Sequence, residues 1–180
     1  MKTDMPKAEE YSLMESLESK NGRLGLGDSR VVLMTEQAYA FLLQVINEHA
    51  PQAIKYAFYD MGYRVGQELM GTLKDRADDP ERAFKYFVET FRQAGYGDIT
   101  VTSFDLSKPE ARLRGTNLFE SGLAKQSGIY RSPRTVDHYS RGMFAGFMSV
   151  LLGREVVCEE MACEFRGDGA CEFIILPFST

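Results

Sequence analysis

Residues 158–173 read CEEMACEFRGDGACEF, and this stretch decides how the end of the chain folds. Its run Gly167-Asp168-Gly169 is a strong turn signal between two apolar segments, so the sequence predicts an antiparallel hairpin. A tight turn at this run pairs Phe165 with Cys171. Because side chains alternate between the two faces of a strand, Cys163 and Cys171 are then diagonal neighbours on one face.

The residue types around this hairpin are those of a metal site. Glu160 shortly precedes Cys163 and can reach round as a third ligand beside Cys163 and Cys171. Two thiolates and a carboxylate suit zinc, which takes four ligands in a closed structural site. The spacing leaves a second interpretation open, in which the cysteines are buried free thiols, since unpaired cysteine is among the most buried residue types.

All three cysteines of the chain, Cys158, Cys163 and Cys171, lie in its last quarter. The acidic N-terminus lacks the apolar stretch of a secretory signal. An odd number of cysteines without an export signal indicates thiols or metal ligands rather than a disulfide framework. The predicted compartment is therefore the cytoplasm.

Composition excludes several classes of protein. With 44% hydrophobic and 26% charged residues among 180, the chain has the make-up of a globular domain. A net charge of −5 argues against nucleic acid as a partner, because phosphate binding needs a basic face. No stretch approaches the ~20 apolar residues that a transmembrane helix needs.

Hydrophobic periodicity and turn signals predict an α+β fold. We expect an N-terminal helix or arm over residues 1–20 and one ligand-binding domain over residues 21–180. Residues 120–134, rich in Ser and Gly, are expected to be irregular. The expected helices span about 6–19, 35–48, 51–73, 80–95 and 135–152, and the expected strands about 23–27, 29–34, 98–106, 111–118, 156–165 and 170–176.

Two predicted helices carry glycines four residues apart, Gly62 with Gly66 and Gly142 with Gly146. A glycine inside a helix costs about 1 kcal/mol relative to alanine, so each pair needs a reason. Either the two helices pack closely through their backbones, or the missing side chains leave room for a ligand. The two interpretations are compatible.

The motif Glu160-x-x-Cys163 followed by Gly167-Asp168-x-x-Cys171-x-Phe173 resembles the closing signature of the 4-vinyl reductase domain family. The resemblance extends diffusely over residues 22–176, and Asn117-x-Phe119-Glu120-Ser121 is similar to a further motif of the family. It implies a fold like that of the small TRAPP vesicle-tethering subunits, with helices packed on an antiparallel sheet, and a homodimer.

The resemblance also implies a metal-ligand set. In phenol-sensing relatives the motif glutamate, its two cysteines and a further cysteine hold zinc, which places Glu160, Cys163 and Cys171 among the ligands here. The fourth position aligns with Asp137, next to His138. Aspartate and histidine also bind zinc, so zinc is the expected metal.

A small hydrophobic ligand is the partner that the resemblance implies, with a tetrapyrrole or its precursor first and an aromatic hydrocarbon second. The phenol sensors contact their ligand with a tryptophan, and this chain has none, which favours a different ligand. Each candidate wall residue has core packing as its alternative. The candidate walls are Tyr59, Tyr63, Phe84, Phe87, Phe91, Phe119, Phe144, Phe147 and His138.

A binding role is favoured over catalysis. No Gly-x-Gly-x-x-Gly turn joins a strand to a helix, so no nucleotide cofactor is expected, and no catalytic residue is predicted. We therefore expect a sensor, carrier or assembly factor, with a protein partner for signalling or assembly. Two alternatives stay open: a vinyl reductase acting on a tetrapyrrole in (bacterio)chlorophyll biosynthesis, and a structural interaction subunit.

Overall fold

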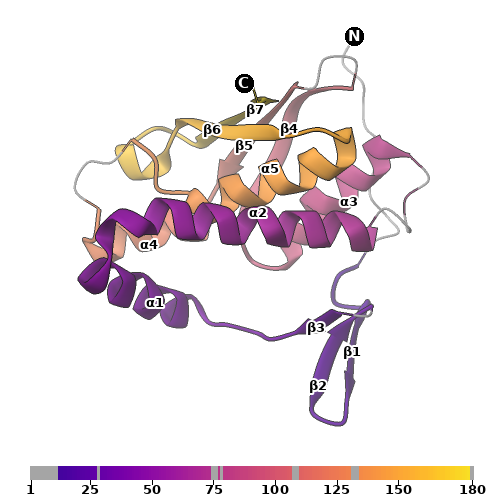
Figure 1. Ribbon diagram of the computed structural model, residues 1–180, viewed down its shortest axis with the longest axis horizontal. Helices are drawn as coiled ribbons and strands as arrows, with labels where there is room; N and C mark the ends of the chain where they lie inside the picture. The colour runs from indigo at the N-terminus through magenta and orange to yellow at the C-terminus, as the bar shows by residue number, and fades with distance from the viewer. Residues whose placement is uncertain are drawn as a thin grey trace.

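A four-stranded antiparallel sheet, in the order β4-β5-β7-β6, carries the helices of this protein (Figure 1). The computed structural model describes residues 12–27, 29–73, 77, 79–106, 110–130 and 134–178. The strands of this sheet are β4 (Asp98–Asp105), β5 (Glu110–Thr116), β6 (Val156–Ala162) and β7 (Cys171–Pro177). The α-helices are α1 (Glu36–His49), α2 (Ile54–Leu73), α3 (Pro80–Gln93), α4 (Phe119–Ser127) and α5 (His138–Leu152).

Helices begin where the sequence places capping residues. The Thr35 side chain accepts a hydrogen bond from the Ala38 amide at the start of α1, and Asp79 does the same for Arg82 at the start of α3. Pro80 occupies the first turn of α3, where its missing N–H costs nothing. The predicted α+β fold, with helices packed on an antiparallel sheet, is confirmed.

The two helices with paired glycines pack directly on each other. A methyl group added at Gly62 or Gly66 would collide with α5 backbone, and one at Gly142 or Gly146 would collide with α2 backbone. Close packing of the two backbones therefore explains both glycine pairs, because no side chain larger than hydrogen fits between the helices. Helix α5 in turn contacts β6 and β7, so the layers run from the sheet through α5 to α2 (Figure 1).

The N-terminal segment differs from the prediction. Leu17–Lys20 is a strand, β1, which pairs with β2 (Arg23–Leu26), and β2 pairs with β3 (Ser29–Val31). The predicted helix over 6–19 is therefore wrong from Leu17 onward, and its residues 6–11 lie outside the described residues. The tight turn, with Asn21 and Gly22 at positive φ, closes the hairpin and gives these residues cross-strand partners. The predicted division at residue 20 falls in this turn.

Two further predictions need correction. Residues 119–127 form helix α4, ended by Gly128 in the left-handed conformation, where an irregular segment was expected. In the terminal hairpin, Glu160 pairs with Phe173 and Ala162 with Glu172, so Phe165 does not pair with Cys171. The strands end earlier because residues 164–166 form a 3-10 turn, η3.

The described helices include none that is both long and apolar enough to cross a bilayer.

The glycine contact between α2 and α5 leads to a stability prediction. Replacing Gly146 with Ala places a methyl group against the Tyr63 backbone, and we expect a loss of roughly 1–3 kcal/mol in the free energy of unfolding. The matched control is Gly71→Ala, also in α2, where nothing lies within 4 Å of the added methyl group. That variant should gain up to about 1 kcal/mol from helix propensity. Urea unfolding measures both, and equal effects would contradict the packing role.

Candidate functional site

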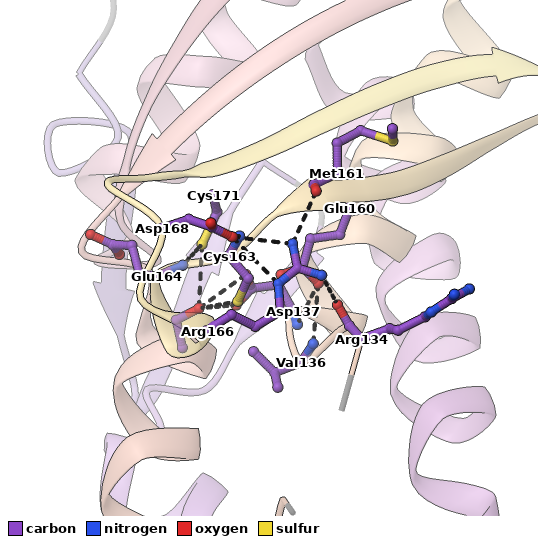
Figure 2. A network of polar contacts seen from close by, with 11 residues as sticks. Arg134, Val136, Asp137, Glu160, Met161, Cys163, Glu164, Arg166, Asp168 and Cys171 are labelled. Atoms are coloured by element: carbon purple, nitrogen blue, oxygen red, sulfur yellow. Dashed lines mark hydrogen bonds and ion pairs between the residues drawn. The ribbon is translucent and has the colours of Figure 1, made fainter. Parts of the chain in front are cut away.

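Four side chains from three parts of the chain meet at the start of α5 (Figure 2). One ligand atom from each of Asp137, Glu160, Cys163 and Cys171 lies within 4.8 Å of the other three, and all four residues are buried. Asp137 directly precedes α5, Glu160 is on β6, Cys163 follows β6, and Cys171 begins β7. The structure thus brings together all four residues predicted as metal ligands.

The connection between β6 and β7 is fixed by its own polar contacts. The Asp168 carboxylate accepts a hydrogen bond of 2.8 Å from the Cys163 amide. Arg166 donates to the carbonyl oxygens of Met161 and Arg134 and forms an ion pair of 3.3 Å with Asp168 (Figure 2). These contacts hold Cys163 beside Cys171 although the two residues are not paired in the sheet.

A serine that the sequence analysis did not select lies at the centre of the group. The hydroxyl of Ser121, on α4, lies 3.1 Å from both carboxylate oxygens of Asp137. It also lies 3.4 Å from the sulfur of Cys163 and 3.3 Å from that of Cys171. The signal that would have found it is the motif around Asn117, since Ser121 ends that motif.

The two carboxyl groups lie in an environment that disfavours their charge. Burial, followed by the negative charge of Cys163, raises the pKa of Asp137 to about 7. Burial, followed by the charge of Asp137, raises the pKa of Glu160 to about 10. Glu160 Oε2 accepts from the backbone N–H of Val136 at 3.1 Å, whereas Oε1 has no hydrogen-bond partner among the described residues.

The two thiols have opposite shifts. A hydrogen bond from Cys171 lowers the pKa of Cys163 to about 5, and the same bond raises the pKa of Cys171. One thiolate and two carboxyls in a buried space repel one another unless a cation or protons neutralise them. An unpaired carboxylate oxygen within reach of two sulfurs therefore fits a divalent cation that accepts both sulfur and oxygen.

A second buried carboxylate lies one turn of α5 further on. Glu120 of α4 accepts hydrogen bonds from the amides of Tyr139 at 2.9 Å and Ser140 at 2.8 Å, and from the Ser140 and Tyr39 hydroxyls. These amides are free at a helix N-terminus, so Glu120 caps α5 from another helix. Burial, followed by the charge of Asp137, raises the pKa of Glu120 to about 8.

The predicted ligand-wall residues lie in three places. Phe84, Phe87 and Phe91 of α3 pack with Phe144 and Phe147 of α5 in the core, and the Phe87 and Phe147 rings stack at 4.1 Å. These five rings fill the space between α3 and α5. Whether a ligand enters among them stays a prediction.

The other predicted wall residues lie outside that stack. Tyr63 donates to the Ser149 hydroxyl at 2.9 Å, and Tyr59 lies under the Arg141 guanidinium. Phe119 packs edge-on against Tyr39. His138 lines a separate cavity, and burial lowers its pKa to about 4.

Comparison with known proteins agrees with the resemblance read from the sequence. Residues 126–177, which include all four predicted metal ligands, match the model of the 4-vinyl reductase domain. A search of curated proteins finds no significant match to the chain.

Solved structures share the fold over most of the chain. The phenol-responsive sensory domain of the transcription activator PoxR, solved with phenol, is 18% identical with a TM-score of 0.83, over 92% of this chain and 86% of that one. A vinyl-4-reductase family protein from Methanocaldococcus jannaschii is 14% identical with a TM-score of 0.56, covering 83% and 85%. The trafficking protein particle complex subunit 3 from Naegleria fowleri, covalently bound to palmitic acid, is 17% identical with a TM-score of 0.50, covering 80% and 95%.

The carboxyl groups of the cluster predict how stability of the metal-free protein depends on pH. The folded-state pKa values of Asp137, Glu160 and Glu120 lie above their ordinary values, so these groups bind extra protons on folding. Cys163 has the opposite shift, but the three carboxyls outweigh one thiol. Stability is therefore highest near the ordinary carboxyl pKa and falls as pH rises toward about 8.

In the presence of a chelator we expect the Tm to decrease from about pH 5 to about pH 8. Differential scanning calorimetry at several pH values measures this slope. Asp137→Asn removes one of the titrating groups and should flatten it. A Tm that rises over this range would contradict the assigned shifts.

Proposed function

We propose that this protein is a sensory-type domain that binds a small hydrophobic molecule and holds a structural zinc ion. The observation that carries the proposal is the shared fold, at a TM-score of 0.83 over 92% of the chain, with a domain solved with phenol. The match of residues 126–177 to the 4-vinyl reductase domain supports it independently, because it rests on sequence. The cytoplasm is the proposed compartment, since its reducing conditions keep thiol ligands available.

The proposed ligand class is a tetrapyrrole or its precursor, with an aromatic hydrocarbon as the second candidate. The proposal for the walls keeps Tyr59, Tyr63, Phe119 and the phenylalanines of α3 and α5. Five of those rings contact one another, so a ligand among them requires α3 to move away from α5. A protein partner would then read that movement.

Zinc is proposed because of the donor set. Two cysteine sulfurs with two carboxylates within 4.8 Å form a group of four, the number that closed zinc sites use. The Glu160 and Asp137 oxygens and the two sulfurs would bind the ion, which would neutralise their mutual repulsion. Calcium and magnesium prefer oxygen ligands alone, so the sulfurs favour zinc over them.

A homodimer is proposed from the N-terminal surface. Val32 and Leu33 are 78% and 79% exposed, and Phe41 of α1 is 57% exposed. The three strands β1, β2 and β3 have four, four and three residues, and this sheet lies away from the main sheet (Figure 1). So small a sheet needs a packing partner, and a second copy of the chain supplies one that covers the apolar residues.

Native mass spectrometry of the protein purified from its own host tests the ligand and the dimer together. We expect a mass of two chains, each with one small organic molecule. A tetrapyrrole also gives visible absorption, which identifies the class. Ligand-free chains at every collision energy would contradict the binding role and favour the structural interaction subunit.

The zinc proposal predicts a specific loss in one variant. Structural zinc contributes on the order of 10 kcal/mol to folding, so Cys171→Ser should lose most of its metal and melt well below the wild type. The matched control is Cys158→Ala, which removes a buried thiol from β6 outside the group of four and should keep its metal. Elemental analysis and Tm measure both variants. Wild-type protein with far less than one zinc per chain would contradict the proposal.

A further inference from the structure

A cavity of about 420 Å³ lies between the end of α1, the short 3-10 turn η1 (Pro51–Ala53), the start of α2 and the segment before α5. A volume of this size is within the usual range of small-molecule sites. It is separate from the stacked phenylalanines of α3 and α5. The lining residues that matter below are Ile54, Lys55, Tyr56, Ile129, Tyr130 and His138.

His138 is the polar side chain that marks this cavity as a binding site. It is 6% exposed, lines the cavity, and makes no side-chain hydrogen bond to any residue that the structure describes. A buried polar side chain normally has a partner, because an unsatisfied group costs free energy. The ring of Tyr130 lies 6.2 Å from the imidazole, so an aromatic wall stands beside the unused donor.

The charge of the lining selects the ligand. Lys55 is the one charged side chain among the residues that line the cavity, and no carboxylate is among them. Its Nζ lies 4.5 Å from the centre of the Tyr56 ring, which holds the cation at the rim. Ile54 is buried, and Ile129 and Tyr130 are half-buried, so the remaining wall is largely apolar. An apolar wall with one cation and one free imidazole matches a flat ring that carries one negative charge.

We propose that this cavity binds a small aromatic carboxylate, whose ring packs against Ile129 and Tyr130 and whose carboxylate is bound by Lys55 and His138. The inference rests on the proposed ligand-binding function and names a site and a ligand class for it. It places the ligand next to the group of four, because His138 directly follows Asp137. An occupant of the cavity therefore contacts the same turn of chain that supplies a predicted metal ligand.

Benzoate is the probe that tests this site, and benzyl alcohol is its uncharged counterpart. Isothermal titration calorimetry on the full chain, as purified with its metal, should give benzoate binding at least about tenfold tighter than benzyl alcohol binding, because the alcohol forms no ion pair. Lys55→Gln should weaken benzoate about tenfold and leave benzyl alcohol unchanged. The matched control is Lys20→Gln, an exposed lysine on β1, which should bind benzoate like the wild type.

His138→Asn provides the second arm, and metal content and Tm establish that this variant is folded. It should also weaken benzoate about tenfold, since the amide does not reach as far as the imidazole. Equal binding of benzoate to wild type and both cavity variants, or no binding to the wild type, would overturn the proposal. Equal binding of benzoate and benzyl alcohol would overturn the assignment of an anion.

Failure of this inference is distinguishable from failure of the ligand-binding function. If native mass spectrometry shows a bound molecule that benzoate does not displace and that Lys55→Gln retains, the protein binds its ligand elsewhere and the cavity assignment is wrong. If no molecule is found and benzoate does not bind, both proposals are wrong.

Discussion

The first turn of α5 is the constraint around which this molecule is organised. A helix start inside a protein leaves N–H groups that need acceptors, and here Glu120 supplies both carboxylate oxygens to them. Because Glu120 comes from α4, this cap fixes α4 against α5. The same α4 turn supplies Ser121, whose hydroxyl contacts Asp137 and both cysteines. Removing the cap would therefore displace the helix and the candidate metal site together.

Negative charge is concentrated around that turn. Asp137, Glu160 and Glu120 are all buried, and their pKa values are all raised by burial first. Burying several carboxyls in one place is costly unless each has donors, protons or a cation. Glu120 has four donors, but Glu160 has an oxygen with none among the described residues. The site is thus built differently from the cap, and the difference is what favours a bound cation there.

Sequence reasoning predicted the group of four but not the strand pairing around it. The assumed tight turn put Cys163 and Cys171 on paired strands, whereas the structure places Cys163 after β6, in a connection that contains η3. The cysteines still meet because Asp168 and Arg166 fold that connection back. Contacts of this kind depend on loop conformation, which residue spacing does not specify. Glycine spacing, in contrast, predicted the α2–α5 contact well, because only backbone packing requires it.

Helix α4 and strand β1 were missed for a related reason. Residues 119–127 are rich in small residues, and their helix is stabilised by burial of Leu123 and Ala124 rather than by helix propensity. Leu17–Lys20 has a helix-like composition, yet pairing with β2 decides its conformation. Tertiary partners outweighed local preference in both segments, and a single sequence does not reveal those partners.

The glycine contact also bears on the cavity beside His138. The cavity has one wall from the start of α2 and one from the start of α5, and backbone contact between Gly62 and Tyr139 lies close to both. Two helices that touch through their backbones hold their ends at a fixed separation. The walls are therefore in place before any ligand arrives, so binding costs little ordering of the chain. The tightly stacked rings between α3 and α5 offer no such preformed space, and this contrast favours the cavity as the first place to look for a ligand.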